Sequence, residues 1–339
     1  MRALARSLKL ALLGTFIINS PLFLGHARIP SVLGYFAVSG ALINMIDVLV
    51  PVLGTEEDDS APPTTLLGSL WLDFGRYAWQ WCAMGVIGAI YLGIQFLLPV
   101  AGCPTGYLGP GGLADNNAFG LCTGGAHHYI DNQLFGPNHI DSSPTCSGTD
   151  GVYQCSAHDP EGALGALSAT WMAWLGLVAG RALVLQRDFA SRVGGDSRSI
   201  SRSIASRWAA SAIVLCTIAG LMCGFKKEGG WIPVNKNLWS PSFVLLLAGF
   251  ANALLAINFV GIDALKLWDG APFRFVGANS LAIYLTSELL CKRAPFLLYF
   301  NATNDWATHS EALASNALVV VVLLIIARFW HLHGWSYNV

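Results

Sequence analysis

The chain has 339 residues, of which 54% are hydrophobic and only 12% are charged, and its mean hydropathy is +0.53. A soluble domain carries about a quarter charged residues, so this composition excludes an ordinary soluble protein. The net charge is −1, and the sequence has no basic patch with interleaved aromatic residues. Nucleic acid is therefore not an expected partner, and the composition indicates a protein embedded in a lipid bilayer.

Long apolar runs recur along the sequence and indicate membrane-spanning helices, because about 20 apolar residues cross the hydrocarbon core of a bilayer. The alternating segments of a membrane β-barrel do not occur. We therefore expect an all-α fold, a polytopic bundle of about eight transmembrane helices. The expected helices lie near Leu8–Leu24, Pro30–Leu53, Ala78–Pro99, Ala163–Leu185, Trp208–Phe225, Pro241–Val260, Phe275–Tyr299 and Ala312–Trp330.

These helices divide the chain into three parts. Residues 1–99 hold the first three helices, with a cytoplasmic linker at 54–77. Residues 100–162 form a long loop rich in Gly, Pro and Cys, and residues 163–339 hold the other five helices. A loop of this length predicts a function, such as a lid over the mouth of the bundle.

Arginine residues predict the orientation in the membrane, because short basic connections stay cytoplasmic. The connection after Leu185 carries Arg187, Arg192, Arg198, Arg202 and Arg207. By alternation, the 100–162 loop and the connections Lys226–Ser240 and Asn301–Glu311 face the lumen or exterior. The last of these contains Asn301-Ala302-Thr303, an acceptable glycosylation sequence, so we expect a glycan at Asn301.

Cysteines in the long loop predict disulfide bonds, because the luminal side of an endomembrane is oxidising. Four cysteines lie there, and of the three pairings that they allow we favour the nearest, Cys103–Cys122 and Cys146–Cys155. Zinc is the alternative, with imidazole ligands from His127, His128, His139 and His158. The spacings match no standard zinc pattern, so we do not expect a metal.

A short polar segment, Gly230–Ser240, lies between two apolar runs. It contains Asn235, Lys236 and Asn237, with a tryptophan on either side, one of them Trp239. A lysine between two amides at a membrane surface suits a polar or anionic ligand. An interfacial turn with aromatic anchors has the same composition.

Several other polar residues lie where a ligand or a proton could be bound. Asp159-Pro160-Glu161-Gly162 is a good helix start, and its carboxylates are also candidates for a proton acceptor or an orienting group. Asn279 and Ser280 fall early in an expected span, and Arg28 precedes another. Such an arginine can bind phosphate or carboxylate, or it can anchor the helix at the lipid headgroups.

Several of these segments resemble the heparan-alpha-glucosaminide N-acetyltransferase family of membrane enzymes. The resemblance covers nearly the whole chain, and its most specific parts are the proline- and glycine-rich loop and the Asn-Lys-Asn-Leu-Trp segment. The matching pieces, in order, are Arg28–Leu33, Gly102–Gly112, Cys122–Ala126, Tyr129–Asp131, Asp159–Gly162, Ile232–Ser240 and Gly277–Ser280.

The resemblance implies a multi-pass enzyme of the lysosomal or another endomembrane, compatible with a homodimer. Such an enzyme transfers acetyl from cytosolic acetyl-CoA to the terminal glucosamine amine of heparan sulfate in the lumen. It implies supporting catalytic roles, in orienting groups or accepting protons, for Asp159 and Glu161. It implies ligand binding by Arg28, Asn235, Lys236, Asn237, Trp239, Asn279 and Ser280.

The sequence also departs from the family pattern. The luminal histidine segment associated with catalysis has no counterpart here, and Gly34 and Tyr35 stand where the family usually has Gln-Arg. We therefore consider first that the chain is the C-terminal portion of such an enzyme, with the sequence incomplete. The second hypothesis is a homologue without catalysis, which would serve as a scaffold or binding partner. A third hypothesis is a small-solute transporter, although the internal repeats typical of transporters are not seen.

Overall fold

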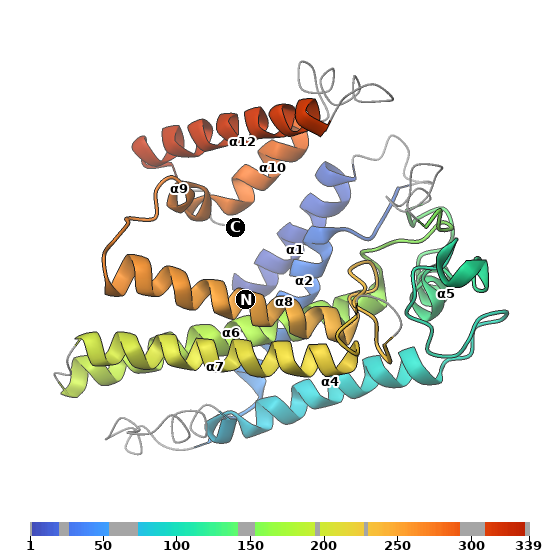
Figure 1. Cartoon of the computed structure of the whole chain (residues 1–339), viewed down its shortest axis with the longest axis horizontal. Helices are drawn as coiled ribbons and strands as arrows, with labels where there is room; N and C mark the ends of the chain where they lie inside the picture. Colours follow the sequence, from blue (N-terminus) through green and yellow to red (C-terminus); the bar gives the residue numbers. More distant parts are fainter. Residues whose placement is uncertain are drawn as a thin grey trace. The chain divides into compact units, whose positions relative to one another are not determined.

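A computed structural model of the protein describes residues 2–19, 27–53, 74–141, 153–193, 197–226, 230–291 and 309–335, and the regular structure in these ranges is entirely helical (Figure 1). This confirms the expected all-α fold. The chain forms two compact units, Met1–Ala264 and Leu265–Val339, and each is described by itself.

Among the described residues of the first unit, five helices are long and apolar enough to cross a bilayer. The spans are Val32–Leu49 in α2, Ala78–Leu97 in α4, Ala163–Leu185 within α6 (Ala163–Val193), Ile200–Met222 within α7 (Ser197–Met222), and Pro241–Ala264, which begins with α8 (Pro241–Phe259). All five coincide with expected spans, and their length and composition support a polytopic membrane protein.

The expected number of eight spans is not confirmed. Near the first expected span, the described residues form α1 (Arg2–Leu13) and a π-helical turn at Gly14–Ile18. In the second unit, α9 (Phe273–Ala278) ends at Asn279, where the backbone leaves the helical region, and α10 (Ser280–Cys291) follows. The last helix, α12 (His309–Leu332), has a shorter apolar stretch, Asn316–Leu332. The break at Asn279 interrupts the expected span Phe275–Tyr299, and parts of this span and of Leu8–Leu24 lie outside the described residues.

Helix α6 is central to the first unit and packs against α2, α4, α7 and α8. The indole of Trp174 on α6 is fully buried with Met84 of α4 and Ile46 of α2. Helices α7 and α8 approach closely at Gly249, where an added Cβ would lie 3.1 Å from the backbone nitrogen of Cys216. Small residues at such contacts allow close packing between membrane helices.

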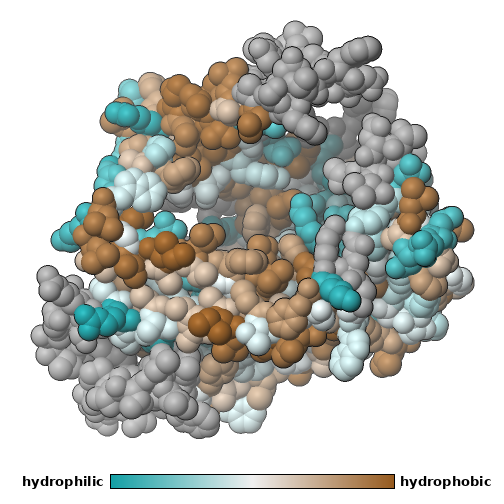
Figure 2. Space-filling view, in the orientation of Figure 1, coloured by the Kyte–Doolittle hydropathy of each residue, from teal (hydrophilic) through white to brown (hydrophobic). Residues whose placement is uncertain are grey.

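Hydrophobic side chains also cover the outside of the bundle. On α7 and α8, Ile213, Leu221, Leu254 and Ile257 are each at least 60% exposed. The face shown in Figure 2 is accordingly largely hydrophobic over these two helices. Apolar side chains exposed along whole helices are expected where lipid, rather than water, is the solvent.

Two of the connections expected to be luminal, the 100–162 loop and Lys226–Ser240, meet at one end of the bundle. The Nδ2 group of Asn235 donates a hydrogen bond to the carbonyl oxygen of Leu108, at 3.0 Å. Gln95, near the end of α4, donates to the carbonyl oxygen of Tyr107 at 3.2 Å. The proline- and glycine-rich loop is thus attached both to a transmembrane helix and to the Gly230–Ser240 segment.

The disulfide Cys103–Cys122 is present, as the nearest pairing predicted. It closes the part of the loop that precedes α5 (Gly125–Leu134). Cys155 is also disulfide-bonded, but its expected partner Cys146 lies outside the described residues. The glycosylation candidate Asn301 and most of the expected cytoplasmic linker 54–77 lie outside them too, so these expectations remain predictions.

We predict that Asp115 and Lys236, both exposed, face the same aqueous compartment, and that the exposed Val52 after α2 faces the opposite one. Single cysteines placed at these positions in a Cys82→Ser background should show this with a membrane-impermeant maleimide. In sealed vesicles, Asp115→Cys and Lys236→Cys should be labelled together. Val52→Cys should be labelled only after permeabilisation, or in vesicles of opposite orientation. Joint labelling of all three in sealed vesicles would contradict the arrangement.

Candidate functional site

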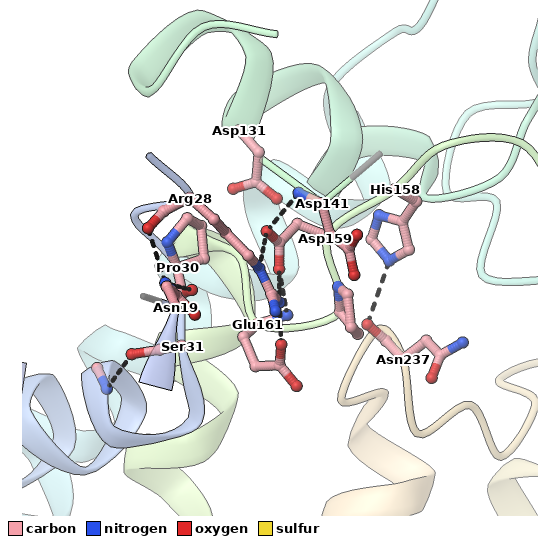
Figure 3. Close-up of polar contacts among 12 residues, drawn as sticks. Asn19, Arg28, Pro30, Ser31, Asp131, Asp141, His158, Asp159, Glu161 and Asn237 are labelled. Carbon is pink, nitrogen blue, oxygen red and sulfur yellow. Dashed lines mark hydrogen bonds and ion pairs between the residues drawn. The ribbon is translucent and has the colours of Figure 1, made fainter. Parts of the chain in front are cut away.

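Arg28 lies just before α2 and connects this segment to the start of α6 (Figure 3). Its Nε donates to Oδ2 of Asp159 at 2.9 Å, and its Nη2 donates to Oδ1 at 2.6 Å. Nη2 also pairs with the carboxylate of Glu161. A two-pronged contact of this kind fixes both distance and orientation, which a single lysine could not do.

The carboxylate of Asp159 is fully buried and accepts two further hydrogen bonds from the backbone. Its Oδ2 accepts from the backbone nitrogen of Asp141 at 2.8 Å, and its Oδ1 accepts from that of Glu161 at 3.0 Å. Both oxygens are therefore engaged by the fold. This geometry shows an organising role for Asp159, and a role in proton transfer stays a prediction.

The charges of this cluster change one another's proton affinity. Burial opposes the charge of Arg28, but the hydrogen bond and charge of Asp159, with Glu161 and Asp141, raise the pKa of the guanidinium above its ordinary value. Burial also raises the pKa of Glu161, and the positive charge of Arg28 offsets part of that rise. Arg28 thus remains a cation with most of its donors directed at protein carboxylates.

Tyr35 connects this cluster to the Gly230–Ser240 segment. Its hydroxyl donates to the carbonyl oxygen of Pro160 at 3.1 Å. Its ring packs edge-on against Trp239, with the ring centroids 5.2 Å apart. Tyr35, which stands where the family usually has arginine, is therefore part of the packing between α2 and the start of α6.

Asp131, on α5, is a buried carboxyl that our site expectations did not include. Its Oδ1 accepts from the backbone nitrogen of Ala163, the first residue of α6, at 2.8 Å. Its Oδ2 is buried without a hydrogen-bond partner among the described residues. Burial raises the pKa of Asp131 to about 7; the bond from Ala163 acts against this rise, and the nearby charge of Asp159 adds to it.

A cavity of about 250 Å³ lies between the proline- and glycine-rich loop and the Gly230–Ser240 segment. It is below the roughly 300–1,000 Å³ of sites for drug-sized ligands, so it suits one small polar group. We call it the loop pocket. Its lining residues are Leu108, Gly109, Pro110, Thr123, Gly124, Tyr153, His158, Pro233, Val234, Asn235, Lys236, Asn237 and Leu238.

The Gly230–Ser240 segment is held by its own polar side chains. Oδ1 of Asn235 accepts from the backbone nitrogen of Asn237 at 3.0 Å, while its Nδ2 bonds to Leu108. Ser240 accepts from the backbone nitrogen of Asn235 at 3.0 Å and caps the start of α8 through Phe243. Asn235 and Ser240 thus form the turn that places Lys236, which is exposed, in the wall of the loop pocket.

His158 was considered from the sequence only as a zinc ligand, yet it lines the loop pocket. Its Nε2 lies 3.3 Å from the carbonyl oxygen of Asn237. Burial lowers its pKa to about 4, although the contact with Asn237 acts against this. Burial, together with nearby His158, likewise lowers the pKa of His127 to about 3. Both rings are therefore neutral above about pH 5. Among the described residues, no group of three or more His, Cys, Asp or Glu side chains is arranged to hold a metal ion.

Of the expected site residues, the first unit brings Asn235, Lys236 and Asn237 into one pocket, and Arg28, Asp159 and Glu161 into one ion cluster. Asn279 and Ser280 belong to the second unit. There the Nδ2 of Asn279 donates to the carbonyl oxygen of Trp335 at 3.1 Å, and Ser280 is exposed at the start of α10. Ligand binding by these two residues remains a prediction.

The fold and the loop pocket define a class: a helical membrane protein with a disulfide-closed extramembrane loop over a small cavity. No protein-family model matches the chain. The heparan-alpha-glucosaminide N-acetyltransferase of Mus musculus is 34% identical to it over 332 residues, which cover 95% of this chain and 47% of the mouse protein. The enzyme of Homo sapiens is 33% identical over 329 residues, covering 95% of this chain and 46% of the human protein.

The expected family relationship is confirmed, and the chain belongs to the heparan-alpha-glucosaminide N-acetyltransferase family. It spans about half the length of the curated relatives it matches.

We predict that Asp131 makes the folded protein less stable as pH rises. Because the fold raises the pKa of Asp131, its contribution to the free energy of unfolding is complete below about pH 4. That contribution is lost as pH rises to about 7. Asp131→Asn keeps an oxygen for Ala163 but does not ionise. Its melting temperature should exceed that of the wild type at pH 7.5, on the order of 5 °C, and match it near pH 4.

Asp115→Asn, which removes an exposed carboxylate of the same loop, is the control and should show no such pH dependence. A difference between Asp131→Asn and the wild type that stays constant from pH 4 to 7.5 would contradict a raised pKa.

Proposed function

We propose that this protein takes part in transferring acetyl from acetyl-CoA to the terminal glucosamine amine of heparan-type glycans at an endomembrane, such as that of the lysosome. The support is the homology over 95% of the chain to enzymes named for the heparan-alpha-glucosaminide reaction. The observation that carries the proposal is the loop pocket. It is built from the two most specific shared segments, Gly102–Gly112 and Ile232–Ser240.

We further propose that the loop pocket binds the sugar acceptor. Its location fits, because the pocket lies between two of the connections expected to be luminal, the 100–162 loop and Lys226–Ser240. Its chemistry fits as well, since it offers polar groups from a backbone turn and one exposed cation, Lys236. Heparan-type glycans carry carboxylates and sulfates, and an ammonium at the mouth attracts them through charge.

Acetyl transfer to an amine also requires a group that removes the proton and donors that stabilise the oxyanion. In this chain, Asp159 and Glu161 are candidates for orienting such groups through Arg28. A homologue that only binds the glycan, as a scaffold, is the second candidate. Both carboxylate oxygens of Asp159 and the hydroxyl of Tyr35 form hydrogen bonds within the fold, which is compatible with a scaffold.

The proposed activity is tested by complementation, because the chain matches less than half of its relatives' length. Membranes containing this chain, alone or with the unmatched part of the mouse relative, receive radiolabelled acetyl-CoA and a glucosamine-terminated heparan oligosaccharide. We expect N-acetylated product from the combination at least tenfold above membranes with the mouse part alone.

Activity of the chain alone would also support the transferase. Binding of the oligosaccharide without acetylation, in either preparation, would contradict the transferase hypothesis and support the scaffold.

Lys236→Ala should weaken the use of an anionic acceptor. We expect KM for a sulfated, glucosamine-terminated oligosaccharide to rise about two- to fivefold, the range expected of an ion pair at an exposed site, and the effect to shrink at high salt. KM for methyl α-D-glucosaminide, which carries no carboxylate or sulfate, should stay the same. Lys226→Ala removes an exposed lysine of the same connection outside the pocket and is the control. Equal KM values for both variants would make Lys236 an interfacial anchor.

A further inference from the structure

The two ring nitrogens of His158 differ in their hydrogen bonding. This difference indicates which kind of group the loop pocket binds. Nε2 lies 3.3 Å from the carbonyl oxygen of Asn237. A carbonyl oxygen only accepts hydrogen bonds, so Nε2 carries the proton and Nδ1 of the neutral ring has a free lone pair. His158 therefore ties the Gly230–Ser240 segment to the loop through one nitrogen and offers an acceptor through the other.

The Nδ1 atom of His158 has no hydrogen-bond partner among the described residues, and the residue is buried, with only 1% of its surface exposed. A buried acceptor without a partner is unfavourable and is rare in folded proteins. The atom lies in the part of the pocket wall formed by Gly124, because a Cβ added at residue 124 would come within 2.7 Å of it. Glycine at 124, with φ +84°, therefore keeps the space next to Nδ1 free of a side chain.

Two other polar side chains in the pocket wall, those of Thr123 and Asn235, are already used by the fold. Thr123 donates to the carbonyl oxygen of Pro110 at 3.3 Å and accepts from the backbone nitrogen of Ser156 at 3.1 Å. Asn235 uses both ends of its amide, as described above. His158 differs from these two residues because its second polar atom is left for a ligand or a bound water.

The surroundings of His158 keep the ring uncharged. His128 of α5 lies close, with the ring centroids 6.4 Å apart, and Asp159 and Asp141 are the nearby carboxylates. Burial lowers the pKa of His158 to about 4 despite these carboxylates. Nδ1 thus remains an acceptor at acidic pH, where an ordinary histidine is protonated and can only donate.

We infer that His158 is a ligand-binding residue of the loop pocket, whose Nδ1 accepts a hydrogen bond from an amine or hydroxyl group of an amino sugar. The choice of an amino sugar rests on the proposed function. The acceptor itself rests on the geometry: a neutral lone pair selects groups that carry a proton on nitrogen or oxygen, and disfavours a carboxylate or sulfate oxygen. Lys236 at the exposed mouth suits those anionic groups instead.

Two substitutions separate the two nitrogens of His158. In His158→Gln, the amide nitrogen reaches the place of Nε2 and can still donate to Asn237, but no acceptor remains at the place of Nδ1. In His158→Asn, the amide lies near the place of Nδ1 and can accept, but the bond to Asn237 is lost. The probe is methyl α-D-glucosaminide, titrated into the detergent-purified full chain and followed by saturation-transfer NMR, with the melting temperature recorded in parallel.

We expect His158→Gln to weaken binding of the glucosaminide about three- to tenfold, the effect of one lost hydrogen bond, with little change in melting temperature. His158→Asn should bind within about twofold of the wild type while melting at a lower temperature. The reverse pattern, with normal binding by the Gln variant and weak binding by the Asn variant, would show that His158 only holds Asn237 in place.

The same titration distinguishes this inference from the proposed function. Binding by the wild type with an unaltered affinity in His158→Gln overturns the inference and leaves the sugar-binding function intact. If the wild type binds neither the glucosaminide nor a glucosamine-terminated heparan oligosaccharide, the proposed acceptor and the inference both fail.

Discussion

The ion pair between Arg28 and Asp159 determines how the loop end of the first unit is assembled. It joins residues 131 positions apart in the chain, one just before α2 and the other just before α6. The same carboxylate holds the backbone of Asp141 and Glu161. Removing one partner of such a buried pair leaves an uncompensated charge, which is far more costly than the pair is favourable. The cluster therefore specifies one arrangement of loop and helices.

Helix α6 is tied by polar contacts at both ends. At its start, Asp131 binds the backbone nitrogen of Ala163. Toward its other end, the guanidinium of Arg181 donates to Asp47 of α2 at 2.6 Å and to Gln80 of α4 at 2.8 Å. In lipid, hydrophobic burial does not drive helices together, so packing and polar contacts of this kind have a larger part in fixing their positions. A central helix tied to its neighbours in this way is a stable base for the loop pocket.

Within the loop pocket, structural and ligand-facing roles fall on different residues. The backbone of the loop and of the Gly230–Ser240 segment is hydrogen-bonded by the side chains of Asn235, Ser240 and Thr123. Lys236 and the Nδ1 atom of His158 are the groups that we assign to the ligand. The Gly230–Ser240 segment thus contains both support of the pocket, from Asn235 and Ser240, and one of the groups proposed to bind the sugar, Lys236. Family resemblance alone does not separate these roles, because all three residues belong to one shared segment.

The sequence by itself determined the fold class, five of the spans, the Cys103–Cys122 pairing and the family, because these depend on composition, on local apolar runs and on motif order. It also identified Lys236 with its flanking asparagines as a candidate site. It did not reveal the helix break at Asn279, because hydropathy does not show where a helix breaks.

Only the tertiary structure decided what each polar group contacts. Asp159 appeared in the sequence as a helix cap or a proton acceptor, and the fold made it the partner of Arg28. Asp131 and the two nitrogens of His158 gained their properties from burial and from distant backbone groups, Ala163 and Asn237. Such contacts join residues far apart in the chain, and a short sequence pattern carries no information about them.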